Sequence, residues 1–225
     1  MYRAAQERDR ERDRRILNNP CTCRHDLQPG QDLKGVNLKW ANLSGVNLSE
    51  ADLSGANLYM ANLKGANLGG ANLNEANLEK AKLGDIWKYL DNEDEEVWLE
   101  AANLGGADLG GANLKWANLS GVNLSEANLE GANLEEAKLE GANLGGADLG
   151  GANLTFALLC RANLEGANLE GANLTDARLY SSNPAMREEY SMGIPTGPNL
   201  ITARADENTT WPEGFDPVAA GVIFK

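Results

Sequence analysis

Residues 107–124 read ADLGGANLKWANLSGVNL, in which a five-residue unit of Ala-Asn-Leu and two variable residues repeats. Leucine keeps this spacing from Leu33 to Leu83 and again from Leu104 to Leu179, 27 times in all. Alanine or valine lies two places before nearly every leucine, and Asn or Asp lies directly before 23 of the 27. A fixed period over so much of a chain indicates a solenoid, whose units pack on their neighbours.

Each unit is predicted to be a three-residue extended side followed by a two-residue corner. Alanine and leucine flank a polar residue, so the alternation of a strand turns both apolar side chains inward. The two variable residues are mostly Gly, Ser, Glu, Lys or Asn, which suit exposed turns. A helix is disfavoured, because apolar spacings that alternate between two and three drift around a 3.6-residue helix.

The repeat over residues 31–180 resembles the pentapeptide-repeat family. The resemblance implies an all-β fold, a right-handed quadrilateral parallel β-helix with four units and 20 residues in each coil. About seven coils follow from 27 units, and their leucines and alanines point inward. Residues 102–114 recur identically at 142–154, an offset of two such coils. The segment 209–217, which contains Trp-Pro-Glu-Gly-Phe-Asp-Pro, resembles the tails of cyanobacterial members of the family.

Three parts are predicted along the chain. Residues 1–30 form a charged N-terminal arm or cap with a short helix, because opposite charges recur at helical spacing. Residues 31–180 form the β-helix, which an acidic insert at 84–101 interrupts. Residues 181–225 form an irregular C-terminal cap, or alternatively a docking peptide. The cap is expected to cover the last coil with Trp211, Phe215, Val218, Ile223 and Phe224.

The insert is expected to be a bulge at one corner of a single continuous rod. With sides numbered from Leu33, Leu83 then lies on side three and Leu104 on side four. Residues 37–51 recur identically at 113–127, and this register keeps the two copies aligned on side two.

The same register gathers large apolar side chains at one corner and predicts a stripe of candidate partner contacts. The stripe comprises Trp40, Tyr59, Met60, Trp116 and Phe156. Two alternatives stay open for this stripe: sequence duplication placed these residues together, or the insert or N-terminal arm covers them. Trp87 and Trp98 of the insert are further candidate contacts, or they pack on the rod.

The net charge of −13 argues against direct nucleic-acid binding, which needs a basic surface. No apolar run is long enough for a membrane span, and no secretory signal is visible, so a cytoplasmic location is expected. Some pentapeptide-repeat proteins mimic DNA and bind gyrase. A DNA mimic should carry negative stripes along its length, whereas five glutamates are predicted to circle this rod: Glu126, Glu130, Glu135, Glu136 and Glu140.

Catalytic chemistry is not indicated. The segment Cys21-Thr22-Cys23-Arg24-His25 lacks the four paired ligands of a structural zinc site, and a surface turn is expected there. Cys160 falls at a corner, where an exposed and oxidisable thiol is expected. The sequence therefore predicts a non-enzymatic rigid scaffold that binds another protein or itself, without metal, cofactor or small-molecule substrate. The alternative is a DNA-mimic regulator of a topoisomerase such as gyrase.

Overall fold

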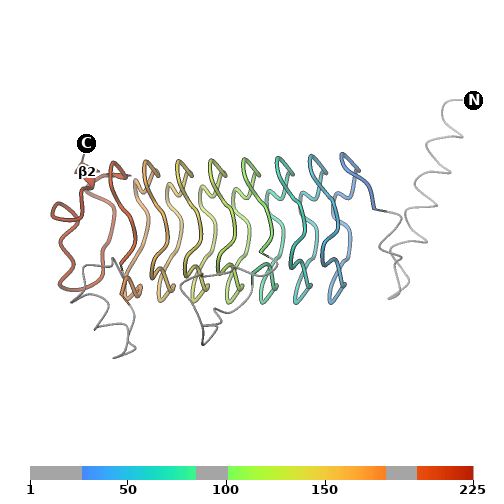
Figure 1. Cartoon of the computed structure of the whole chain (residues 1–225), viewed down its shortest axis with the longest axis horizontal. Coiled ribbons are helices and arrows are strands. Elements are labelled where there is room, and N and C mark those ends of the chain that lie inside the picture. The colour runs from blue at the N-terminus through green and yellow to red at the C-terminus, as the bar shows by residue number, and fades with distance from the viewer. Residues whose placement is uncertain (1–26, 85–100, 181–196, 225) are drawn as a thin grey trace, which may run out of the picture.

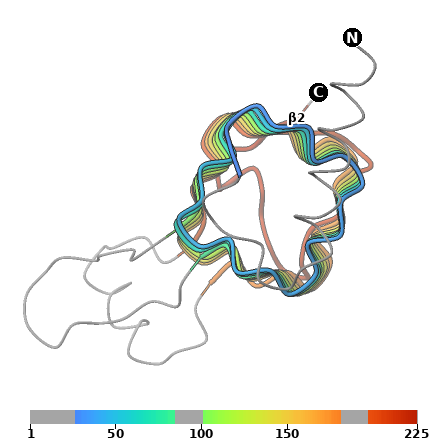
Figure 2. The ribbon, with the colours of Figure 1, turned by 90° about the vertical axis from the view of Figure 1, so that its right-hand side faces the viewer.

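The computed structural model describes residues 27–84, 101–180 and 197–224. These residues form a rod of stacked square coils, seen from the side in Figure 1 and along its axis in Figure 2. The fold is the right-handed quadrilateral parallel β-helix that the resemblance to the pentapeptide-repeat family implied. The described part of the chain contains no helix and two short strands, β1 (Arg204–Ala205) and β2 (Ile223–Phe224).

The sides of successive coils pair through parallel bridges between residues directly before the leucines. Bridged residues are 20 apart within each run, as for Asn57 and Asn77, and 36 apart across the interruption, as for Asn77 and Asn113. From Leu33 onward we call the four sides one to four, and corner two, for example, is the corner that follows side two. The side-two bridges join Asn37, Asn57, Asn77, Asn113, Asn133, Asn153, Asn173 and Thr210.

The rod continues without a change of register across the interruption. Every corner from Leu33 to Leu174 closes with a hydrogen bond from a backbone N–H to the carbonyl of the preceding inward leucine, as from Ala107 to Leu104 at 3.0 Å. The interrupted corner makes the same bond, because the N–H of Ala102 donates to the carbonyl of Leu83 at 2.8 Å. The predicted register, with Leu83 on side three and Leu104 on side four, is therefore confirmed.

The interior of the rod is a column of leucines and alanines. Leu114 and Ala112 are fully buried, as are almost all their counterparts from coil to coil. Burying one leucine contributes about 2 kcal/mol by transfer from water. Because the coils lie about 4.8 Å apart, each leucine packs on those above and below it.

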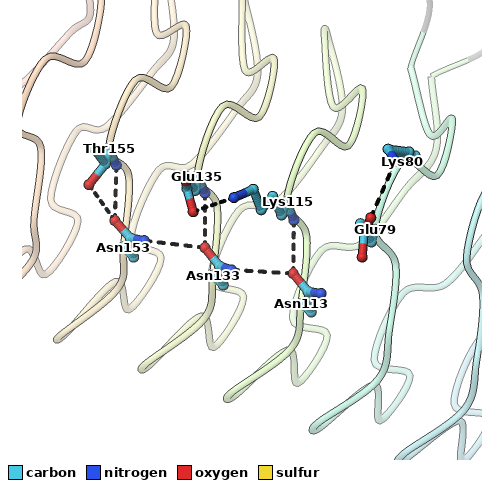
Figure 3. A network of polar contacts seen from close by, with 8 residues as sticks. All are labelled: Glu79, Lys80, Asn113, Lys115, Asn133, Glu135, Asn153 and Thr155. Carbon is cyan, nitrogen blue, oxygen red and sulfur yellow. Dashed lines mark hydrogen bonds and ion pairs between the residues drawn. The ribbon is translucent and has the colours of Figure 1, made fainter.

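Asparagine makes both the corner and the contact between coils. In Figure 3 the Oδ1 atom of Asn133 accepts the backbone N–H of Glu135 at 3.2 Å. The Nδ2 atom of Asn133 donates to Oδ1 of Asn113 in the neighbouring coil at 3.4 Å, and Asn153 donates to Asn133 at 3.3 Å. Each such asparagine therefore supports its own turn and the stacking of the next coil.

The coil extends beyond residue 180, where the sequence predicted an irregular cap to begin. Asn199, Arg204 and Thr210 form parallel bridges with side positions of the preceding coil. β2 then pairs in parallel with β1, so it adds a further layer at the C-terminal end of the rod (Figure 1). Leu200, Ala203 and Ala205 are buried at the inward positions of the repeat, and Ala205 stands where the repeat has leucine.

The tail covers the last coil with only part of the predicted set. Trp211 and Phe215 pack on the core, with ring centroids 5.3 Å apart. Val218, Ile223 and Phe224 are exposed, contrary to the prediction; Val222 is buried instead.

Asp206 ties the tail to the rod. Its Oδ1 atom accepts the backbone N–H of Gly171 at 2.8 Å. Hydrogen bonds from Asn208, Gly171 and Thr209 lower the pKa of Asp206 to about 2. The carboxylate therefore stays ionised at any ordinary pH.

The predicted N-terminal helix and most of both the charged arm and the acidic insert lie outside the described residues.

Replacing Ala112 by leucine should overpack the rod, because Ala112 is fully buried against the inward leucines. We expect the free energy of unfolding to fall by about 1–3 kcal/mol, measured by urea denaturation followed by circular dichroism. Glu130→Leu, which places leucine at an exposed corner, is the matched control and should change it by less than about 0.5 kcal/mol. Equal losses in both variants would contradict this account of the core.

Candidate functional site

Corner two differs from the other corners of the rod in its residues. It presents two corner positions in each of seven successive coils, which we number as levels one to seven from the N-terminal end. The pairs are Lys39-Trp40, Tyr59-Met60, Glu79-Lys80, Lys115-Trp116, Glu135-Glu136, Thr155-Phe156 and Thr175-Asp176. The structure therefore brings the predicted stripe together on one corner, with Lys80 and Glu136 between its apolar members.

The second position of each corner has a backbone that favours glycine. Trp40, Trp116 and Phe156 have φ of 61°, 58° and 59°, in the left-handed region. At the other three corners of the described coils, this position holds 15 glycines and only five other residues: Glu50, Glu75, Glu126, Arg161 and Thr202. None of the seven second positions at corner two is glycine. A side chain in this conformation costs about 1–2 kcal/mol, so corner two keeps large side chains against the backbone preference.

Corner two also holds all the large exposed apolar side chains of the described repeat, residues 27–84 and 101–179. The exposed fractions are 65% for Trp40, 46% for Met60, 39% for Trp116 and 50% for Phe156. Exposed apolar side chains that align on a polar molecule usually mark a contact surface.

Lys39, Lys80 and Lys115 place their ammonium groups over the aromatic rings of the first four levels, and Lys115 Nζ lies 4.3 Å from the Trp116 ring centroid. Lys39 Nζ lies 4.2 Å from the ring centroid of Trp40 and 4.9 Å from that of Tyr59. Lys80 Nζ lies 5.5 Å from the Tyr59 ring and 4.9 Å from the Trp116 ring. Each such cation–π contact contributes about 0.5–1 kcal/mol at an exposed site. The hydrogen bond from Lys80 to the Tyr59 hydroxyl, at 3.4 Å, raises the pKa of Lys80.

Charge changes sign along corner two. Levels one to four carry three lysines and one glutamate, whereas levels five to seven carry Glu135, Glu136 and Asp176. Two ion pairs are made within the corner, Lys115–Glu135 at 2.8 Å and Lys80–Glu79 at 3.5 Å, both visible in Figure 3. Among the described residues Glu136 and Asp176 make no ion pair, so the acidic half keeps uncompensated charge.

The other predicted positions divide into those that the structure places and those that it does not. Trp87 and Trp98 of the insert and the Cys21–His25 segment lie outside the described residues. Within the described residues no three His, Cys, Asp or Glu side chains lie close enough to hold a metal ion. The same residues include no helix long and apolar enough to cross a membrane.

Cys160 is less accessible than its corner position predicted. The residue is half-buried. Burial, with a smaller effect from the Glu140 carboxylate, raises the pKa of the Cys160 thiol to about 11. The thiol is therefore protonated at neutral pH and is a poor nucleophile, contrary to the expected oxidisable group.

Two features of the site were missed at the sequence level, although the signal for both was present. Lys39 and Lys115 stand directly before Trp40 and Trp116 in the sequence, and the register places Lys80 between the rings of Tyr59 and Trp116. The missing glycines of corner two become informative only once the second corner position is known to have positive φ.

Comparison with known families identifies the repeat. A family model described as pentapeptide repeats matches the chain in 8 copies, over residues 32–70, 61–83, 99–135, 117–155, 137–176 and 152–183. The chain belongs to the pentapeptide-repeat family. Proteins of this family are generally non-enzymatic structural or interaction modules.

Solved structures with similar folds include several cyanobacterial proteins. The pentapeptide repeat protein Rfr23 from Cyanothece 51142 is 33% identical, with 64% of this chain and 90% of that chain covered and a TM-score of 0.50. The pentapeptide repeat protein alr5209 from Nostoc PCC 7120 is 38% identical, with 55% and 84% covered and a TM-score of 0.35. HetL from Nostoc sp. strain PCC 7120, involved in heterocyst differentiation regulation, is 24% identical, with 87% and 85% covered and a TM-score of 0.27. No curated protein matches the chain.

Replacing the apolar residues of corner two by glycine should leave the rod intact. In the triple variant Trp40→Gly, Met60→Gly and Phe156→Gly, relief of backbone strain offsets the lost side-chain contacts and the greater freedom of the unfolded chain. We expect the free energy of unfolding to change by less than about 1 kcal/mol per substitution, measured by urea denaturation.

Gly151→Trp at corner one is the matched reverse change, because Gly151 has φ of +63° and open space around an added Cβ. It should cost about 1–2 kcal/mol. If the triple glycine variant unfolds, or if its free energy of unfolding falls as much as for a cavity in the core, corner two instead stabilises the rod.

The Cys160 thiol should react slowly in the folded protein. In a Cys21→Ser, Cys23→Ser variant, alkylation by iodoacetamide at pH 8 should be about 100-fold slower than for a thiol at its ordinary pKa, since the pKa is raised from 9.0 to about 11. The same variant in urea gives the unfolded reference rate. Equal rates in the two states would contradict the burial of this thiol.

Proposed function

We propose that this protein is a non-enzymatic rigid scaffold that binds another protein chain through corner two. The absence of glycine at all seven second positions of this corner carries the proposal. Natural sequences keep strained or unfavourable local choices mainly where function requires them. Here the residues kept in place of glycine include Trp40, Trp116 and Phe156, the residue types that dominate binding energy at protein interfaces.

Sequence duplication does not account for the whole corner. The copies at 37–51 and 113–127 explain why Trp40 and Trp116 lie in line. The same shift of 76 residues matches Met60 with Glu136, and the 40-residue shift between the copies at 102–114 and 142–154 matches Trp116 with Phe156, so Met60 alone has no apolar counterpart. Met60 therefore arose, or was retained, independently of these copies.

The rigidity of the rod suits such a role. The contact side chains stand on turns that hydrogen bonds hold at every level, and cation–π contacts order the rings. A partner that binds corner two therefore loses little additional conformational entropy from the scaffold. The spacing of the contacts along the rod is set by the stacking of the coils, about 4.8 Å per level.

The alternative of a DNA mimic receives less support from the geometry. Glu126, Glu130, Glu140 and the pair Glu135–Glu136 lie at four different corners around the rod, as the register predicted. This arrangement encircles the rod, whereas rows of phosphates run along DNA.

The proposal is tested by capture of binding partners with the intact chain as bait. Proteins from a lysate of the source organism are captured on wild-type protein, on the Trp40→Gly, Met60→Gly, Phe156→Gly variant, and on a Glu126→Lys control at corner four. An excess of the chain itself, carrying a second tag, is added to the lysate so that binding of one copy to another is also detected. We expect at least one partner to be lost from the triple variant and kept by the control.

Unchanged binding to the triple variant would overturn the proposal. A bait that lacks residues 85–100 shows which partners bind through the insert, which contains Trp87 and Trp98, because those partners are no longer captured. Gyrase captured equally by wild type and triple variant at low salt, and lost at moderate salt, would favour the DNA-mimic alternative.

A further inference from the structure

We infer that the partner of corner two is a second copy of this chain, which docks antiparallel along the same corner about a two-fold axis through level four. The inference rests on the proposed function, because it takes corner two to be a contact surface and names the occupant. The order of the second residues of the corner pairs is complementary to its own reverse.

An antiparallel second copy places level one opposite level seven, level two opposite level six and level three opposite level five. Among the second residues of the corner pairs, which form the second-position column, Lys80 then faces Glu136 of the other copy and Met60 faces Phe156. The first pair is an ion pair and the second is a favourable sulfur–aromatic contact. Trp40 faces Asp176, where the indole N–H has an acceptor available.

Level four lies on the axis, so Trp116 faces Trp116 of the second copy. Two aromatic rings related by a two-fold axis can stack with an offset, which is a preferred aromatic geometry. Each of the unlike pairs forms twice, as an isologous interface requires.

Charge selects the antiparallel arrangement over the parallel one. Levels one to four hold Lys39, Lys80 and Lys115 with one glutamate, and levels five to seven hold only acidic charges. A parallel second copy would place the basic half on the basic half and the acidic half on the acidic half, which is unfavourable. The antiparallel copy supplies Lys80 to Glu136, which makes no ion pair with the described residues of its own chain.

The first residues of the corner pairs are less complementary, because Glu79 faces Glu135 of the second copy. Tyr59 faces Thr155 and Lys39 faces Thr175, both neutral partners for the second copy. Lys115 faces its own counterpart, but the glutamates of the second copy lie one level to either side of it. Those glutamates already have ion pairs within their own chain, at 2.8 and 3.5 Å.

The expected dimer is weak. The corner is a stripe roughly 30 Å long and only two residues wide. A contact along it therefore buries less than the area of about 800 Å² per partner that a standard interface buries. We therefore expect a dissociation constant on the order of micromolar at low salt, which rises with ionic strength.

Sedimentation equilibrium of the full chain at roughly 1–100 micromolar tests the association. Lys80→Glu should raise the dissociation constant at least about 10-fold, because it sets like charges opposite each other, and Glu136→Lys should do the same. The double exchange Lys80→Glu, Glu136→Lys should restore the dimer. Both positions have left-handed backbone, at φ 58° and 56°, and so does the control Glu126→Lys at corner four, at φ 59°, which should have no effect.

Disulfide trapping tests the orientation, in a background with Cys21, Cys23 and Cys160 replaced by serine. Trp116→Cys should cross-link to itself under mild oxidation. Met60→Cys alone should not, whereas Met60→Cys with Phe156→Cys should.

A monomer at every concentration, an unrestored double exchange, or self-cross-linking of Met60→Cys alone would each overturn the antiparallel dimer. If the chain stays monomeric while the triple glycine variant loses a different captured protein, the proposed function stands and the second copy is wrong. If nothing is lost in either experiment, both fail.

Discussion

Leucine must lie on leucine in every coil, and the rest of the structure depends on this stacking. The inward column is filled by side chains that touch those of the coils above and below, so each coil has to return to the same four corners after 20 residues. The backbone bridges and the asparagine contacts between coils follow the same repeat. An insertion is tolerated only where it leaves and re-enters at one corner, as between Leu83 and Ala102, whose hydrogen bond is kept.

The same constraint separates architecture from function. Inward positions have no freedom, and Asn or Asp stands before 23 of the 27 leucines, where its side chain holds the corner. Variation is left to the two corner positions, and the second of these has a backbone that favours glycine. Corner two departs from this preference at every level, and there the departures are aromatic, apolar or charged. A surface that repeats a costly choice seven times is the part of the rod most clearly shaped by something other than folding.

Much of this was predictable from the sequence, because a repeat makes the packing periodic. The five-residue spacing predicted a solenoid of extended sides and corners, and the resemblance to the pentapeptide-repeat family implied the β-helix. The duplicated segments supported the register across the interruption and hence the alignment of Trp40 with Trp116. The coil around Asn199, Arg204 and Thr210 was not predicted, because buried Ala205 stands where the repeat has leucine and one extra residue precedes Thr210. The burial of Cys160 was also not predicted, since a corner position was taken to be an exposed one.

The register across residues 85–100 is the claim on which the composition of corner two depends. Deleting these residues restores a five-residue spacing between Leu83 and Leu104, so the rod should close over the gap as an uninterrupted repeat. Thermal unfolding of this deletion variant, followed by far-ultraviolet circular dichroism, is the most direct measurement. A single cooperative transition within a few degrees of the wild-type melting temperature is the predicted result. Two separate transitions, or loss of the folded spectrum, would show that the two runs are not one continuous rod.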